Sequence, residues 1–202
     1  MTRLRLTIIL VAVGLLAAVA AFSWYRTLNR PVDTVQIDPS VHIGGPFALS
    51  DQDGHPVTEA ALKGKWTAVF FGYTYCPDIC PLTLQNLALT QRKLGGKAKD
   101  LQIFFITVDP ARDTPQALKT YLASGGFPSG VVGLSGPQDR ITAVEKAYRA
   151  VPLRYEKNGT YYFGHTSIIY LMDPNGRFDE PLTADLGADQ NAQLIRQAMN
   201  GG

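Results

Sequence analysis

The sequence predicts a mixed α/β fold in which helices cover both faces of a central sheet. Short apolar segments, each typical of a buried strand, alternate along the chain with longer segments of helical periodicity. Asp53-Gly54 and Asn158-Gly159 mark the tight turns of an N-terminal and a later β-hairpin. A length of 202 residues fits one such domain with a short additional segment.

The strands are expected where short runs of branched and aromatic residues are bounded by turn residues. A run that is apolar at nearly every position, rather than at alternate ones, indicates a strand buried on both faces. The expected strands are 67–72, 101–109, 130–136 and 167–172, and the hairpins occupy 46–58 and 154–163.

The helices are expected where apolar residues recur at helical spacing between start and stop signals. Thr114-Pro115 predicts one start, because threonine is a good N-cap and proline suits the first turn. Gly95-Gly96 predicts the end of an earlier helix. The expected helices are 81–96, 114–122, 138–149 and an amphipathic closing helix at 189–199.

The first thirty residues have a different composition. An uncharged apolar run from Leu6 to Tyr25 has close to the ~20 residues that a helix needs to cross a bilayer. Trp24 and Tyr25 stand where interfacial aromatic residues belong. A signal peptide is the alternative, because Ala18-Val19-Ala20 fits a cleavage site.

We therefore expect residues 1–30 to form a single transmembrane anchor or an uncleaved signal, 31–40 a tether, and 41–202 an exported domain. The simplest setting is a bacterial inner membrane, with the C-terminal domain facing the periplasm. A formal net charge of +2, without any basic run interleaved with aromatic residues, gives no reason to expect a nucleic-acid partner.

The chain has two cysteines, Cys76 and Cys80, both in the segment "FGYTYCPDICP". This segment follows the expected strand 67–72 and leads into a helix. The amide dipoles at a helix start favour an anion, so this position lowers the pKa of a thiol. A βαβ unit with cysteines at its strand-to-helix turn is the thioredoxin arrangement.

Three residues separate Cys76 from Cys80, and this spacing bears on their chemistry. Residues four apart on a helix have Cβ atoms roughly 5–6 Å apart, whereas a relaxed disulfide needs about 3.8 Å. A distorted first turn would still allow a disulfide. Two neighbouring sulfurs can also bind one metal ion between them without strain.

A third ligand would close such a metal site, and His42, His55, His165 and Met172 are the candidates. His42 and His55 fit solvated turns, and Met172 fits the core. His165 directly precedes the expected strand 167–172, so we favour it. Iron–sulfur clusters and structural zinc usually take four ligands, so two thiolates and one imidazole fit three-coordinate Cu(I).

Three segments, "FGYTYCPDICP", "FITVDPARDTP" and "GHTSIIYLMDPNG", resemble the Sco/SenC family of copper proteins involved in cytochrome c oxidase assembly. The resemblance extends over essentially the whole exported part. It implies a thioredoxin-like domain that binds copper, as Cu(I) and also as Cu(II), through Cys76, Cys80 and His165. It also implies a role in loading the binuclear centre of the oxidase's copper-bearing subunit, by donating copper, by reducing that subunit's cysteines, or by both.

One departure from the family pattern concerns the expected ligand. The family usually has Asp-His-Ser where this chain has Gly164-His165-Thr166, so an acidic neighbour that could orient the imidazole is missing. Asp109 and Asp113 match the family pattern, but helix capping and an ion pair with Arg112 also explain them, and we interpret both as structural.

A metallochaperone of this kind is not an enzyme in the strict sense, and it needs a periplasmic thiol reductant and a copper donor. The alternative is a thiol–disulfide oxidoreductase with Cys76 and Cys80 as the catalytic pair and no obligatory copper. A peroxidase would need threonine where Tyr73 stands. A purely structural disulfide would close only a very small loop and add little stability.

Overall fold

A computed structural model of the chain describes residues 8, 13–20, 22–23, 25, 42–150, 152–164 and 167–201. The chain divides into two compact units, Met1–Val41 and His42–Gly202. Within the described residues, no helix is both long and apolar enough to cross a membrane. More than half of the expected anchor and the whole of the expected tether lie outside the described residues.

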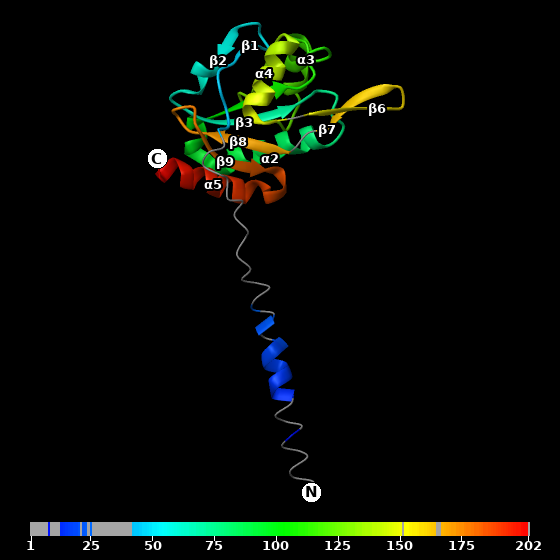
Figure 1. Cartoon of the computed structure of the whole chain (residues 1–202). Helices are drawn as coiled ribbons and strands as arrows, with labels where there is room; N and C mark the ends of the chain where they lie inside the picture. Colours follow the sequence, from blue (N-terminus) through cyan, green and yellow to red (C-terminus); the bar gives the residue numbers. More distant parts are fainter. Residues whose placement is uncertain are drawn as a thin grey trace. The chain divides into compact units, whose positions relative to one another are not determined.

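The second unit is built on a mixed sheet, as predicted (Figure 1). The strands β3, β4 and β5 run parallel, and the flanking strands pair antiparallel. In spatial order the seven strands of this sheet in the described chain are β2 (Pro56–Thr58), β1 (Ala48–Asp51), β5 (Val132–Ser135), β4 (Leu101–Thr107), β3 (Trp66–Gly72), β8 (Ile168–Met172) and β9 (Phe178–Thr183).

The two central strands explain why the sequence shows uninterrupted apolar runs. Every residue of β3 is buried, and all but one residue of β4 are buried. Phe70 of β3 lies opposite Phe105 of β4, and the two rings meet edge to face with centroids 5.9 Å apart. Parallel strands covered on both faces need apolar side chains at consecutive positions, and this is what the sequence supplies.

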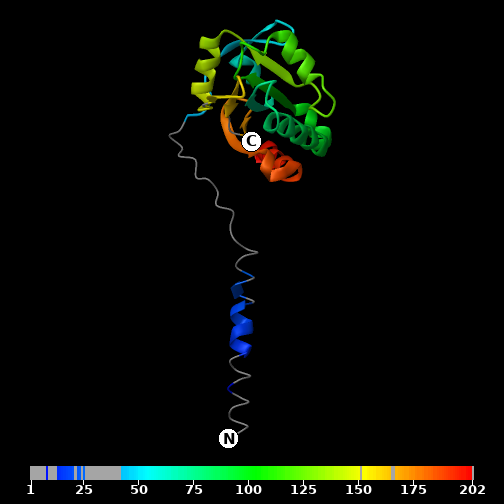
Figure 2. The same ribbon diagram turned by 90° about the vertical axis from the view of Figure 1, so that its right-hand side faces the viewer.

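Helices cover both faces of the sheet, as predicted. They are α2 (Ile79–Leu94), α3 (Pro115–Leu122), α4 (Gln138–Tyr148) and α5 (Gly187–Gly201). Tyr148 of α4 packs on Phe71, with ring centroids 5.4 Å apart, whereas α2, α3 and α5 lie on the face that carries Phe105. Figure 2 shows α4 across the sheet from α2 and α3. Three short 3-10 helices complete the unit: η1 (Glu59–Leu62), η2 (Gly95–Asp100) and η3 (Ala184–Leu186).

Of two helix starts predicted from the sequence, one is confirmed and the other lies two residues earlier than expected. Thr114 caps α3 as predicted, because its hydroxyl accepts the backbone N–H of Ala117 at 3.2 Å. Helix α2 begins at Ile79, two residues before the expected start. The carbonyl of Asp78 already accepts the N–H of Leu82 at 3.2 Å. Cys80 therefore lies in the first helical turn.

The predicted second hairpin is also present, and it forms a separate two-stranded sheet of β6 (Leu153–Lys157) and β7 (Thr160–Gly164). Asn158 and Gly159 both have positive φ, 53° and 74°, as a two-residue hairpin turn of type I′ requires. In Figure 1 this hairpin extends away from the central sheet. Its strand β7 ends one residue before His165.

Candidate metal centre

Cys76 and Cys80 lie together between the end of β3 and the first turn of α2. Both are present as thiols. The backbone N–H of Cys80 donates to Cys76 Sγ at 3.4 Å, so the first turn of α2 directs a positive dipole end at this sulfur. Both residues are buried: Cys76 is 9% exposed and Cys80 is not exposed at all.

Gly72, the last residue of β3, allows α2 to approach the sheet. A Cβ atom at this position would lie 2.9 Å from Cys80 Sγ and 2.7 Å from the ring of Phe105. No side chain fits into that space. The glycine that ends the apolar run in the sequence therefore determines how deeply Cys80 sits.

The surroundings of the two sulfurs fit a soft cation. The expectation that the helix start lowers the pKa of a thiol is wrong for Cys80, because burial and the adjacent Cys76 raise the pKa of this thiol well above its ordinary value. A bound metal ion would reverse this effect, because its positive charge stabilises a coordinating thiolate. Thiolate sulfur is the donor that Cu(I) prefers among protein ligands.

The cysteine loop is held by the neighbouring loop after β4. Asp113 is fully buried and accepts the Thr74 N–H at 3.1 Å and the Thr74 hydroxyl at 2.6 Å. The Thr107 hydroxyl donates to Asp113 Oδ2 at 2.6 Å. Burial raises the pKa of Asp113, while these hydrogen bonds act in the opposite direction.

These contacts refine the interpretation of the two aspartates. Asp109 forms the expected ion pair with Arg112. Asp113 is structural as expected, but it ties the cysteine loop to the end of β4 rather than capping a helix. The carboxyl ends of adjacent parallel strands lie at the same edge of a sheet. This rule predicts from the sequence that the two loops are neighbours, but it does not predict which side chains of the loops form hydrogen bonds.

Tyr73 connects the cysteine loop to the β6–β7 hairpin. Its hydroxyl accepts the backbone N–H of Phe163 at 3.2 Å, and the two rings pack edge to face with centroids 5.6 Å apart. Burial, above all, raises the pKa of Tyr73 to about 12, so the phenol stays protonated at neutral pH. The hairpin strand that leads to His165 is thus attached to the loop that carries Cys76 and Cys80.

The third expected ligand, His165, and its neighbour Thr166 lie outside the described residues. Among the residues that are described, no group of three or more histidine, cysteine, aspartate or glutamate side chains could hold a metal ion. The set of Cys76, Cys80 and His165 therefore stays a prediction.

The other three ligand candidates lie where the sequence predicts. His42 is exposed. His55 is exposed in the first hairpin and pairs with Asp51 at 3.1 Å. Met172 is fully buried in the core.

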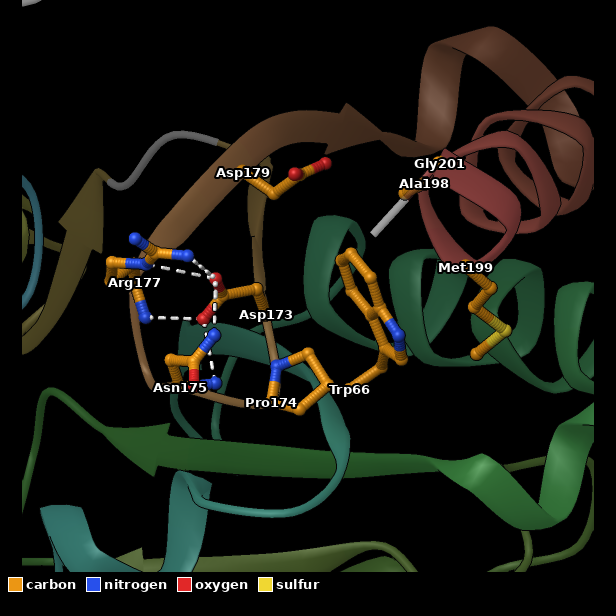
Figure 3. Close-up of a pocket in the computed structure, with 9 residues that line it drawn as sticks. All are labelled: Trp66, Asp173, Pro174, Asn175, Arg177, Asp179, Ala198, Met199 and Gly201. Atoms are coloured by element: carbon orange, nitrogen blue, oxygen red, sulfur yellow. Dashed lines mark hydrogen bonds and ion pairs between the residues drawn. The ribbon is translucent and has the colours of Figure 1, made fainter.

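A pocket of about 590 Å³ lies at the opposite end of β3 (Figure 3). Trp66 begins β3 and lines this pocket. A seven-residue strand separates it from the cysteine loop, which is roughly 20 Å. Asp173 accepts the N–H groups of Asn175 and Arg177 at 2.8 Å and pairs with the Arg177 guanidinium. Since these polar groups satisfy one another within a turn, we assign the pocket no part in the metal centre.

The fold and the site together define the chain as a thioredoxin-like protein with two thiols at the strand-to-helix turn. The family model described as SCO1/SenC matches residues 35–200. The chain therefore belongs to the SCO1/SenC family, as the three sequence segments predicted.

Three known proteins illustrate this similarity, one by its sequence and two by their solved structures. The mitochondrial protein SCO2 of Saccharomyces cerevisiae is 37% identical over 173 residues, which is 84% of this chain but 57% of the yeast protein. Copper-bound ScoI of Bradyrhizobium japonicum is 42% identical with a TM-score of 0.71, covering 77% of this chain and 98% of that chain. BsSco, described as having a disulfide switch and as a member of the Sco family of cytochrome c oxidase assembly proteins, is 26% identical with a TM-score of 0.65, covering 81% of this chain and 97% of that chain.

Proposed function

We propose that this chain is a copper-binding assembly factor for cytochrome c oxidase, which holds Cu(I) through Cys76, Cys80 and His165. The observation that carries the proposal is the pair of buried cysteines at the strand-to-helix turn, where the backbone N–H of Cys80 donates to Cys76 Sγ at 3.4 Å. Copper in the related ScoI structure supports the choice of metal. The description of BsSco as a member of a family of cytochrome c oxidase assembly proteins supports a role in assembling that oxidase.

Each of the three residues has a distinct part in this function. Cys76 and Cys80 would bind the ion as thiolates, and His165 would complete a three-coordinate site. A disulfide between the cysteines would remove both sulfur ligands. Copper loading therefore requires a thiol reductant, and the cysteine pair makes the protein sensitive to the redox state of its compartment.

The proposal includes a location and partners. The apolar run from Leu6 to Tyr25 supports a single anchor in a bacterial inner membrane, with the C-terminal domain in the periplasm. The partners would be the copper-bearing subunit of the oxidase, a periplasmic copper donor and a thiol reductant. This chain would help to assemble the copper centre of the subunit by donating copper, by reducing the subunit's cysteines, or by both.

A titration with Cu(I) tests the proposal directly. The reduced full-length chain competes with bicinchoninate for Cu(I), and we expect one tightly bound ion per chain. Loss of an outer partner of a metal ligand usually costs about 10–100-fold in affinity, so His165→Ala, which removes a ligand, should cost at least as much. His55→Ala is the matched control, because His55 is exposed and paired with Asp51. An affinity of His165→Ala equal to that of the wild type would remove His165 from the site.

Thiol–disulfide exchange is the second candidate function, and the unequal burial of the two sulfurs favours it. Cys76, the less buried of the two, would attack a target disulfide as a thiolate and release one target thiolate. Cys80, fully buried, would then attack Cys76 Sγ, release the second target thiolate and leave a Cys76–Cys80 disulfide. A reduced chain that fails to retain Cu(I) in the titration would leave this function in place of copper delivery.

A further inference from the structure

The pocket at the start of β3 contains a buried tryptophan with an unused hydrogen-bond donor (Figure 3). Trp66 is only 8% exposed, and it lines this pocket of about 590 Å³. Its indole N–H has no hydrogen-bond acceptor among the described residues. The N–H group of a buried tryptophan usually finds a partner. The donor is therefore available to a molecule that enters the pocket.

Asp179, on the strand β9, brings an unpaired negative charge to the same pocket. Its carboxylate has no hydrogen bond and no ion pair with any described residue. Partial burial and the neighbouring charge of Asp173 raise the pKa of Asp179. A cation beside this carboxylate would offset both effects, because it stabilises the charged form.

The arginine that lines the pocket does not neutralise Asp179. Arg177 pairs with Asp173 instead, since its Nε and Nη2 atoms each lie 3.0 Å from Oδ2 of that carboxylate. The dashed lines in Figure 3 join Arg177 and Asn175 to Asp173, and none of them reaches Asp179. Asp173 and Arg177 thus balance each other, and the charge of Asp179 remains for a ligand.

The remaining wall of the pocket is mostly apolar. Ala198 and Met199 of α5 line it, together with Pro174. Ligand sites commonly have volumes of about 300–1,000 Å³, with an apolar lining and a few polar groups that fix the orientation of the ligand. The pocket therefore has the size and the lining of a site for a small molecule or a side chain.

The polar groups of the pocket select the chemistry of that ligand. The face of a tryptophan ring attracts a cation. A guanidinium stacks on aromatic rings and pairs with a carboxylate through two hydrogen bonds, which an ammonium does not do. A peptide carbonyl is an acceptor for the indole N–H. An arginine residue within a peptide supplies both the guanidinium and the carbonyl.

We propose that this pocket binds an arginine residue of a peptide segment, with the guanidinium on the Trp66 ring and paired with Asp179, and a peptide carbonyl on the indole N–H. The site lies at the opposite end of β3 from the cysteine loop. The proposal therefore goes beyond the proposed function and does not depend on copper.

A titration of the full-length, copper-free chain with acetyl-Gly-Arg-Gly-amide tests the proposal. The indole N–H signals in a heteronuclear NMR spectrum are the readout, and Trp24→Phe shows which of the chain's two tryptophans gives each signal. We expect the Trp66 signal to move and to reach saturation, together with the methyl signal of Met199. The Trp24 signal should not move.

The same peptide with citrulline in place of arginine is the matched neutral ligand, because it keeps the shape of the side chain and removes the charge. We expect it to bind about 5- to 30-fold more weakly, since it loses the attraction to the carboxylate and to the ring face. Butylguanidinium is the small free cation without a peptide carbonyl. We expect it to bind more weakly than the arginine peptide, because the indole N–H then lacks its acceptor.

Asp179→Asn is the variant that isolates the charge. Asp179 is exposed, so its replacement leaves the core intact, and we expect a loss of about 3-fold or more for the arginine peptide and none for the citrulline peptide. Asp185→Asn is the matched control, because Asp185 is also exposed but does not line the pocket. Its affinity should equal that of the wild type.

Three results would overturn the proposal. The first is the absence of a saturable shift of the Trp66 signal with the arginine peptide. The second is an equal affinity for the arginine and citrulline peptides, or an unchanged affinity in Asp179→Asn, because either would mean that no cation is recognised. The third is an affinity for butylguanidinium equal to that for the peptide, which would make the ligand a free small cation.

Discussion

At the scale of single residues, Glu145 is the clearest case of a group in an unfavourable position. It lies on α4 with 8% exposure, and its Oε1 atom is buried and has no hydrogen-bond partner among the described residues. Burial raises the pKa of its carboxyl group to about 7 from an ordinary value of 4.5. Folding therefore favours the protonated form of Glu145.

This shift predicts a pH dependence of stability. Between about pH 4.5 and 7 the folded chain holds this proton more tightly than the unfolded chain, so the contribution of Glu145 to the free energy of unfolding falls as pH rises. Glu145→Gln removes the effect. We expect the variant to exceed the wild type by about 1–3 kcal/mol at pH 8 and to differ little at pH 4.

Urea unfolding of the full-length chain at the two pH values measures this difference. Glu156→Gln is the control, because the Glu156 side chain is 81% exposed on β6. A Glu145→Gln variant that is less stable than the wild type at pH 8 would show that the carboxylate makes favourable contacts there.

Several residue roles follow from the sequence and others do not. Cys76 and Cys80 at a helix start and Thr114 as a cap were predictable, because these effects depend on residues within four positions. The hydrogen bonds from Thr74 to Asp113 and from Phe163 to Tyr73 join residues 39 and 90 positions apart. Their pairing depends on the assembled sheet, and a single sequence gives no local signal for it.

At the scale of elements, the approach of α2 to β3 depends on Gly72. A methyl group there would clash with the Phe105 ring and with Cys80 Sγ. Overpacking of this kind costs typically 1–3 kcal/mol, so we expect Gly72→Ala to lower the free energy of unfolding by that amount. Urea unfolding of the reduced chain measures it.

Gly96 supplies the matched control for this substitution. No atom lies within 4 Å of the Cβ that Gly96→Ala would add, and its backbone needs no positive φ. We expect no loss of stability there. A Gly72→Ala chain as stable as Gly96→Ala would mean that β3 and α2 separate without cost, and Cys80 would then not be held rigidly.

Helices and strands were predicted correctly where neighbouring residues in the sequence mark them. Buried strands and both hairpins were predicted, because apolar runs and glycine turns mark them. Strand β9 was not expected. It lies at the sheet edge, has the sequence "FDEPLT" and contains Pro181, so it resembles a loop in composition. Helix α2 starts earlier than expected because the carbonyl of Asp78 accepts the N–H of Leu82. Pro77 and Pro81 follow the two cysteines, and either proline suits a first helical turn, so the sequence leaves the start ambiguous between them.

At the scale of the whole second unit, three separate segments meet at one edge of the sheet. The loops after β3 and β4 lie side by side because these strands are parallel neighbours. The β6–β7 hairpin is joined to the first loop by the hydrogen bond between Phe163 and Tyr73, and to the second by the hydrogen bond between Tyr161 and Asp109. The fold thus brings the two cysteine sulfurs and the side chains that hold their loop to one edge of the sheet. The family resemblance predicts that His165 joins Cys76 and Cys80 there, and this stays a prediction because residue 165 lies outside the described residues.

X-ray absorption spectroscopy of the Cu(I)-loaded, reduced full-length chain tests the central claim most directly, since it reports the atoms bound to the ion. The account predicts two sulfur ligands and one imidazole nitrogen, with the nitrogen signal absent in His165→Ala. Copper bound by sulfur alone in the wild-type chain would contradict it.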